Sequence, residues 1–250
     1  MIDADISHED AESTVVLLHS LALDRTIWGD FAARLGADRC VIVPDLPGHG
    51  ADPQGDPTSV ETMADGVAEL LRANGRSGVT LIGMSLGGSV AQALTIRHPD
   101  LVDALGLIDT TGWYGPDAPT AWAQRANQAK DQGIASLAGF QLDRWFTPAF
   151  REAHPQTGQR LLEIFGRNDL SSYVASCTAL GAMDLRSRLP EISVPVAIVV
   201  GELDQATPPD HAYAIASLVP QATVTVLPDC KHLSAIERPD DVIAALAGVL

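Results

Sequence analysis

Three residues far apart in the sequence, Ser85, Asp204 and His232, are of the types that together carry out nucleophilic acyl transfer. A serine hydroxyl is a weak nucleophile at neutral pH, so it needs a base within hydrogen-bond reach. The base in turn needs an acid that fixes its tautomer, and histidine and aspartate are suited to these two roles. We therefore predict Ser85 as nucleophile, His232 as base and Asp204 as the orienting acid.

The sequence around Ser85 predicts a sharp turn between a strand and a helix. Residues 78–84 form a short apolar run typical of a buried strand, and residues 86–97 place apolar side chains on one helical face. Residues 83–87 match G-x-S-x-G, in which larger flanking side chains would collide with the neighbouring backbone. Because helix amino ends favour negative charge, the backbone N–H of Leu86 is a candidate oxyanion donor. The alternative is a glycine-rich turn with an incidental serine.

Two further apolar runs end just before the proposed acid and base. Asp204 follows PVAIVVG, and His232 follows ATVTVL, so both are expected on loops at the same sheet edge as Ser85. Asp109, which ends LGLID, is an alternative acid from a neighbouring strand. Glu237 lies close to the histidine in sequence, and we interpret it as a solvated loop charge.

A second oxyanion donor is expected from the loop after the run TVVLL. The chain there contains His19, Ser20 and Leu21, and the backbone N–H of Leu21 is the candidate that would act with that of Leu86. The stretch DLPGHG forms a turn after another predicted strand. For His49 in that turn we expect a buried hydrogen bond that holds the turn rather than a catalytic role.

Six short apolar runs rich in β-branched residues require a sheet to position these groups. Amphipathic stretches separate most of the runs, and this alternation is typical of an α/β fold with a mostly parallel, doubly wound sheet. The runs are STVVLLHS, RCVIVPD, VTLIGMS, ALGLIDT, PVAIVVGELD and ATVTVLPD.

The interval from residue 113 to residue 183 breaks this rhythm, because its sequence contains no convincing strand. We predict four helical pieces there, at residues 119–132, 134–146, 148–165 and 169–182. An insertion at the carboxyl ends of the strands would cover the site. The sequence therefore predicts an α/β core of residues 1–112 and 184–250 and a helical cap of residues 113–183.

Composition limits the classes of partner. The chain has 250 residues and a formal net charge of −16, and nucleic-acid binding instead needs clustered cations. No apolar run approaches the roughly 20 residues that cross a bilayer, and the acidic start is unlike a signal peptide. Three widely spaced cysteines fit neither a disulfide framework nor a zinc site. We expect a soluble, cytoplasmic protein that acts on a small molecule without a metal or other cofactor and binds neither nucleic acid nor membrane.

The chain resembles the α/β-hydrolase superfamily over nearly its whole length, and Ser, Asp and His occur in the order of that superfamily. Within it, the chain is similar to the β-ketoadipate (3-oxoadipate) enol-lactone hydrolases of bacterial aromatic degradation. The stretches that carry the resemblance are SLALDRTIW, GMSLGG, RWFTPAFR, GELDQATPP and KHLSAIERP. In DLPGHG, Pro47 stands where those enzymes usually carry Arg. The resemblance implies an α/β-hydrolase fold with the cap inserted after the sixth core strand, and hydrolysis of a carboxylic ester or lactone through an acyl-enzyme.

The resemblance also implies a five-membered enol lactone that bears a free carboxylate. Such an anion needs a cation or several donors to enter an apolar pocket. Arg144 beside Trp145 is the first candidate and Arg125 beside Trp122 the second, while surface positions and ordinary packing are the alternatives for these residues. Other reactions remain open on the same site, namely carboxylester hydrolysis, perhydrolysis or carbon–carbon bond hydrolysis. So does a ligand receptor of this fold with very slow turnover.

Overall fold

The computed structural model describes residues 2–51 and 57–250, and in these residues a seven-stranded sheet forms the centre. The strand order is β1-β3-β2-β4-β5-β6-β7, with β1 antiparallel to β3 and every other pair parallel. The strands are β1 Ala4–Ser7, β2 Ser13–Leu18, β3 Arg39–Pro44, β4 Val79–Met84, β5 Val102–Ile108, β6 Val196–Gly201 and β7 Ala222–Leu227. The prediction of a mostly parallel sheet is confirmed.

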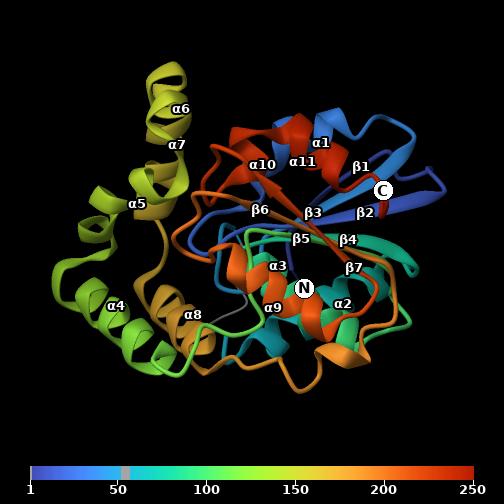
Figure 1. Cartoon of the computed structure of the whole chain (residues 1–250), viewed down its shortest axis with the longest axis horizontal. Coiled ribbons are helices and arrows are strands. Elements are labelled where there is room, and N and C mark those ends of the chain that lie inside the picture. The colour runs from blue at the N-terminus through green and yellow to red at the C-terminus, as the bar shows by residue number, and fades with distance from the viewer. Residues whose placement is uncertain (1, 52–56) are drawn as a thin grey trace.

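Helices cover both faces of this sheet, as the doubly wound pattern predicts. Figure 1 shows α2, α3 and α9 on one side and α1, α10 and α11 on the other. Their bounds are α1 Gly29–Arg34, α2 Val60–Ala73, α3 Leu86–Arg97, α9 Pro209–Leu218, α10 Ser234–Glu237 and α11 Pro239–Ala245. Two short 3₁₀ helices, Arg25–Trp28 and Leu189–Glu191, complete the layers.

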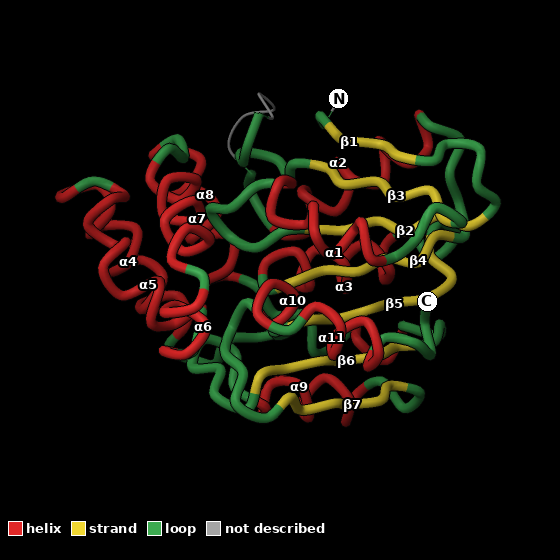
Figure 2. Tube along the Cα trace, turned by 90° about the horizontal axis from the view of Figure 1, so that it is seen from above, coloured by secondary structure: helices red, strands yellow, loops and turns green. Residues whose placement is uncertain are grey.

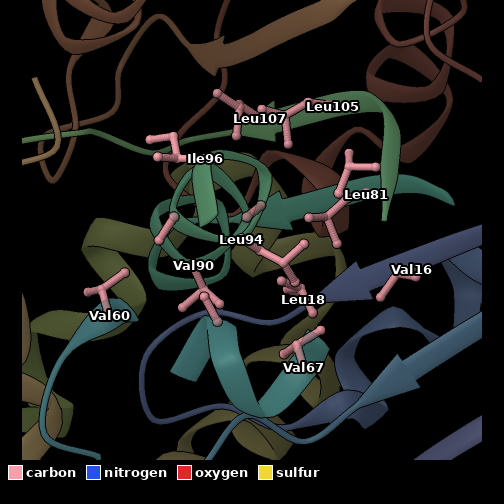
Figure 3. Packing of buried hydrophobic residues seen from close by; sticks show 14 of the residues in the cluster. Val16, Leu18, Val60, Val67, Leu81, Val90, Leu94, Ile96, Leu105 and Leu107 are labelled. Atoms are coloured by element: carbon pink, nitrogen blue, oxygen red, sulfur yellow. The ribbon is translucent and has the colours of Figure 1, made fainter. Parts of the chain in front are cut away.

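Alternate residues of a central strand enter two separate apolar cores, because successive side chains of a strand point to opposite faces. Val16 and Leu18 of β2 pack in the cluster that holds α2 and α3 (Figure 3), whereas Val15 and Leu17 pack with the helices of the other face. Both faces are therefore buried, which accounts for the nearly unbroken apolar character of the strands.

A group of helices lies beyond one end of the sheet, as Figures 1 and 2 both show. These helices occupy the chain between β5 and β6 and are α4 Ala118–Gln132, α5 Ala138–Trp145, α6 Pro148–Ala153, α7 Pro155–Gly166 and α8 Leu170–Ala182, with a 3₁₀ turn at Ile134–Leu137. A bridge between Trp113 and Asp184, and a 2.9 Å hydrogen bond from Leu185 N to Gly112 O, bring the two ends of the segment together. We call residues 113–183 the cap; the division into core and cap stays a prediction.

Two details differ from the sequence predictions. The cap follows the fifth described strand rather than the sixth, because a single strand, β1, precedes β2 and only β3, β4 and β5 follow before the cap. The helical piece predicted at residues 148–165 is two helices, α6 and α7. Pro155 has no backbone N–H and restrains the residue before it, and His154 adopts φ −130° and ψ 56° at the break.

The described part of the chain also bears on two predictions from composition. All three cysteines are buried and unpaired. None of the described helices combines the length and apolar character that crossing a membrane requires.

Candidate active site

Ser85 occupies the turn between β4 and α3. Its backbone has φ 56° and ψ −115°, a conformation that residues other than glycine rarely adopt. The surrounding glycines allow this turn. A Cβ on Gly83 would lie 2.2 Å from the carbonyl oxygen of Gly87, and one on Gly87 would lie 2.2 Å from the carbonyl oxygen of Leu18. The turn therefore excludes side chains at both positions, as the G-x-S-x-G pattern predicts.

The side chains of Ser85, His232 and Asp204 form a continuous chain of hydrogen bonds. Ser85 Oγ lies 2.9 Å from His232 Nε2, and His232 Nδ1 lies 2.8 Å from Asp204 Oδ2. Asp204 Oδ1 also accepts hydrogen bonds from the backbone N–H groups of Ala206 and Thr207, at 2.7 and 3.1 Å. The acid is thus held in one orientation, with one oxygen directed at the imidazole. This arrangement suits transfer of the serine proton to the imidazole.

The pKa values of the pair shift in opposite directions. Burial favours the neutral acid, but the charge of His232 and the hydrogen bonds from His232, Thr207 and Ala206 outweigh it and hold the pKa of Asp204 below its ordinary value. Burial also disfavours a charged imidazole, but the negative charge and hydrogen bond of Asp204 raise the pKa of His232. His232 is therefore a stronger base than an isolated histidine.

Asp109, the alternative acid, is fully buried and makes no hydrogen bond to the imidazole among the described residues. Its carboxylate accepts hydrogen bonds from Gly201 N at 3.0 Å and from Ser234 N at 2.8 Å. Burial and the nearby charge of Asp204 raise its pKa to about 7. Asp109 thus joins β5 to β6 and to the segment after His232.

The candidate oxyanion donors lie on two segments next to Ser85. Leu86 is the first residue of α3, so its N–H has no acceptor within the helix. Leu21 lines the same cavity as Ser85, and its N–H makes no hydrogen bond among the described residues. His19 holds this loop, because its Nδ1 donates to Ser20 O at 2.9 Å and its Nε2 accepts from Leu46 N at 2.9 Å. The roles of Leu21 and Leu86 stay predictions.

The turn after β3 contains the buried His49, as predicted. Its Nδ1 lies 3.1 Å from Pro47 O, within the turn itself, and its ring is 5.2 Å from that of His19. Burial lowers the pKa of His49 to about 3 and that of His19 to about 4. Both imidazoles are therefore neutral at pH 7, in accord with a structural role.

A cavity of about 50 Å³ lies between Ser85, His232 and the cap. All four residues predicted to bind substrate line it, together with one oxyanion candidate: Trp122, Arg125, Arg144, Trp145 and Leu21. A second cavity of about 240 Å³ shares Trp122, Arg125 and Arg144 with the first and lies beside it under the cap. Their contact with substrate stays a prediction.

The two arginines of this cavity have no acidic partner among the described residues. Arg125 Nε donates to the Tyr173 hydroxyl at 2.6 Å, and its guanidinium lies 5.3 Å from the ring centre of Trp122. Burial, and then the positive charge of Arg125, lower the pKa of Arg144. The described lining of the catalytic cavity therefore carries two arginines and no acidic side chain, in a strongly acidic chain.

The segment that bears His232 is joined to the cap through its backbone. His232 N donates to Arg144 O at 3.4 Å, and Leu233 N donates to Trp145 O at 3.2 Å. Residues 232–233 of the histidine loop therefore lie directly against the end of α5, which bears the predicted substrate-binding arginine. The position of the base and the position of Arg144 are thus coupled through two hydrogen bonds.

Glu237 strengthens this junction, so its interpretation as a solvated loop charge is wrong. It is buried; one carboxylate oxygen accepts from the backbone N–H and the hydroxyl of Thr147, and the other accepts from Lys231 N at 3.1 Å. The cap residue Thr147 lies 90 positions away in sequence, so the local sequence around Glu237 carries no signal of this contact.

Four further residues that line the cavity were not singled out from the sequence, namely Tyr114, Gln141, Leu180 and Ala206. Tyr114 follows β5 in the stretch GWYG, and Gln141 lies on α5 one turn before Trp145. The sequence could have indicated Tyr114, because an aromatic pair flanked by glycines follows a buried strand there and the carboxyl ends of the strands form the site. Gln141 has no such signal.

Comparisons with known proteins agree with this geometry. A sequence profile described as "Alpha/beta hydrolase family" matches residues 15–246. The 3-oxoadipate enol-lactonase 2 of Acinetobacter baylyi is 28% identical over 94% of this chain and 88% of its own length. The pimeloyl-[acyl-carrier protein] methyl ester esterase of Chromobacterium violaceum is 30% identical over 93% of this chain and 92% of its own length.

A solved structure shows the same arrangement over nearly the full length. The crystal structure of the enol-lactonase from Burkholderia xenovorans LB400 superposes with a TM-score of 0.92 and 29% identity, covering 99% of this chain and 95% of that one. The profile, the curated relatives and this structure all match through both the sheet and the cap. The chain belongs to the alpha/beta hydrolase family.

Proposed function

We propose that this protein hydrolyses a carboxylic ester or lactone whose substrate carries a free carboxylate, through an acyl-enzyme on Ser85. The observation that carries the proposal is the cavity over Ser85 and His232, whose lining includes Arg144 and Arg125, neither of which has an acidic partner among the described residues. The enol-lactonases among its relatives make 3-oxoadipate enol-lactone the first substrate to test.

In the first half of the reaction Ser85 becomes acylated. Ser85 Oγ attacks the carbonyl carbon while His232 Nε2 takes the hydroxyl proton, and Asp204 stabilises the resulting imidazolium. The N–H groups of Leu86 and Leu21 stabilise the oxyanion. The bond between the carbonyl carbon and the ring oxygen then breaks and opens the lactone. The leaving enolate takes the proton from His232, and the acyl group stays on Ser85.

In the second half a water molecule releases the acyl group. His232 removes a proton from this water, and the hydroxide attacks the acyl carbonyl and forms a second oxyanion at the same donors. The bond to Ser85 Oγ breaks, and the proton on His232 returns to the serine. The product leaves with one new carboxylate, and the enzyme regains its starting protonation state.

The arginines supply recognition of the substrate carboxylate. Taking a carboxylate out of water is costly unless a partner replaces its hydration, and a guanidinium can do so with two parallel hydrogen bonds. Burial and mutual repulsion already disfavour the charged form of Arg144 beside Arg125, so a bound anion relieves an existing cost. An anionic substrate therefore fits this cavity better than a neutral one.

The test compares 3-oxoadipate enol-lactone with neutral aryl esters in the wild type and in Arg144→Ala. We expect the variant to lose at least about tenfold in kcat/KM on the lactone, the effect of one lost charged contact, and much less on aryl esters. Arg188→Gln, on an exposed arginine paired with Glu191, is the matched control for loss of a positive charge. Equal losses on both substrates, or none, would remove the carboxylate-recognition part of the proposal.

A second candidate is an esterase that cleaves open-chain methyl esters. The methyl ester esterase of Chromobacterium violaceum, at 30% identity, favours it. The same chemistry on Ser85 applies, with an alkoxide instead of an enolate as the leaving group. Assays with monomethyl esters of dicarboxylic acids beside the enol-lactone distinguish the two, since the preferred substrate has the higher kcat/KM.

A further inference from the structure

Tyr114 stands between the catalytic cavity and two other cavities. It lines the cavity of about 50 Å³ over Ser85, the adjoining cavity of about 240 Å³, and a third cavity of about 410 Å³ on its other side. Among the described residues that line these three spaces, Tyr114 alone is common to all of them. Tyr114 is thus the one described lining residue that the catalytic cavity and the largest of the three have in common.

The third cavity is suited to an apolar chain. Its lining comes from the segment after β5, from α9 and from the 3₁₀ helix before β6. The apolar members on these helices are Leu189, Ala214, Ile215 and Leu218, and the charged members are Arg186 and Asp210. Arg186 is already neutralised by Asp184 at 2.6 Å and lies over the ring of Trp113. The cavity therefore favours hydrocarbon over a second anion.

The side chain of Tyr114 is held by ring contacts and by packing against the apolar core on the α2–α3 face of the sheet. Its ring meets that of Trp122 at 5.2 Å and that of His211 at 6.3 Å, both edge to face, and its hydroxyl has no hydrogen-bond partner within residues 2–51 and 57–250. The backbone of the neighbouring Trp113 is fixed, because its backbone N–H donates to Thr111 Oγ1 at 3.1 Å. The backbone is thus restrained, while the phenol can be removed without leaving a polar group unpaired.

The catalytic cavity by itself is small for an ester or lactone substrate, since ligand sites usually measure about 300–1,000 Å³. A substrate must therefore extend beyond it, either into the adjoining cavity of about 240 Å³ or past Tyr114 into the cavity of about 410 Å³. We infer that Tyr114 is a specificity-determining residue that limits the length of the apolar chain on the substrate by closing the 410 Å³ cavity to the catalytic site. This inference rests on the proposed function.

The experiment measures chain-length preference in Tyr114→Ala and in Tyr114→Phe, the control that keeps the ring and removes the hydroxyl. One series of p-nitrophenyl esters varies the acyl chain from acetate to octanoate, and a second series of butanoates varies the alcohol from methyl to octyl. For each series we compare kcat/KM on the longest ester with kcat/KM on the shortest. In Tyr114→Ala this ratio should rise at least about tenfold over the wild type in one series, and that series identifies whether the acyl chain or the alcohol enters the cavity. Tyr114→Phe should keep the wild-type ratio.

Ala214→Phe, at an exposed position of α9 that lines the third cavity, provides a second readout. Added to Tyr114→Ala, it should refill the cavity and restore the short-chain preference. If Tyr114→Ala does not fold, Tyr114→Val takes its place. Ratios within twofold of the wild type in both series, from folded and active variants, would overturn the inference but leave the proposed function standing. A wild type that hydrolyses no ester or lactone would overturn both.

Discussion

Replacing the two buried aspartates one at a time should separate catalysis from stability. In Asp204→Asn the amide oxygen can keep the hydrogen bonds from the backbone of residues 206 and 207, which places the NH₂ group against His232 Nδ1. The imidazole must then carry its proton on Nε2, which can no longer accept the proton of Ser85. We expect kcat to fall by about 10⁴, the usual effect of the wrong tautomer, with little change in stability.

Asp109→Asn should have the opposite effect. Its two carboxylate oxygens accept from Gly201 N and Ser234 N, and an amide can satisfy one of these N–H groups. The other N–H group then faces the amide NH₂ and has no acceptor, which should lower the free energy of unfolding by about 1–3 kcal/mol. The tautomer of His232 is unaffected, so kcat should fall by less than about tenfold.

Steady-state hydrolysis of an aryl ester and urea unfolding at pH 7 measure these two effects on the same preparations. Circular dichroism at 25 °C confirms that each variant is folded during the rate assay. The reasoning is refuted if Asp109→Asn loses about 10⁴ in kcat while Asp204→Asn stays active. That result would make Asp109 the acid that orients His232.

Three other changes test the turn, the oxyanion loop and the cap junction. Gly87→Ala places a methyl 2.2 Å from Leu18 O, so ester turnover should be lost or the urea midpoint lowered; a stable, fully active variant would contradict the strained turn. The pKa of the buried His19 is lowered to about 4 from its value of 6.5 in the unfolded chain. Between these two values the unfolded chain binds more protons than the folded one, so the free energy of unfolding decreases as the pH is lowered. Unfolding at pH 5 should show about 2 kcal/mol less stability from this residue than at pH 7, and His19→Gln should shrink the difference. Glu237→Ala leaves backbone N–H groups at Thr147 and in the histidine loop unpaired, which should lower the free energy of unfolding by about 1–3 kcal/mol for each; an unchanged urea midpoint would count against the junction.

The sheet and the meeting of Ser85, Asp204 and His232 were predictable because each feature has a local signal. β-branched runs identify the strands, and parallel strands end at a common edge, so residues just after them meet even when they are far apart in sequence. The choice between Asp204 and Asp109 was less accessible. Both follow strands, and the direction of the His232 ring depends on loop geometry that spacing does not encode.

The relation between the cap and the core could not be predicted in the same way. Glu237 is buried because Thr147 of the cap supplies two donors, and neither residue has a sequence context that indicates the other. The partition by Tyr114 likewise depends on Trp122 and His211, which belong to different elements. Such contacts depend on tertiary packing, whereas the cap helices themselves follow from local periodicity.

The most direct measurement of the central mechanism is identification of the residue that carries the acyl group. The enzyme is quenched in acid during turnover of a slow aryl ester, digested and analysed by mass spectrometry, with Ser85→Ala in parallel. We predict that the acyl mass appears on the peptide containing Ser85 and is absent from the inactive variant. An acyl group on another residue, or undiminished turnover by Ser85→Ala, would contradict nucleophilic catalysis by this serine.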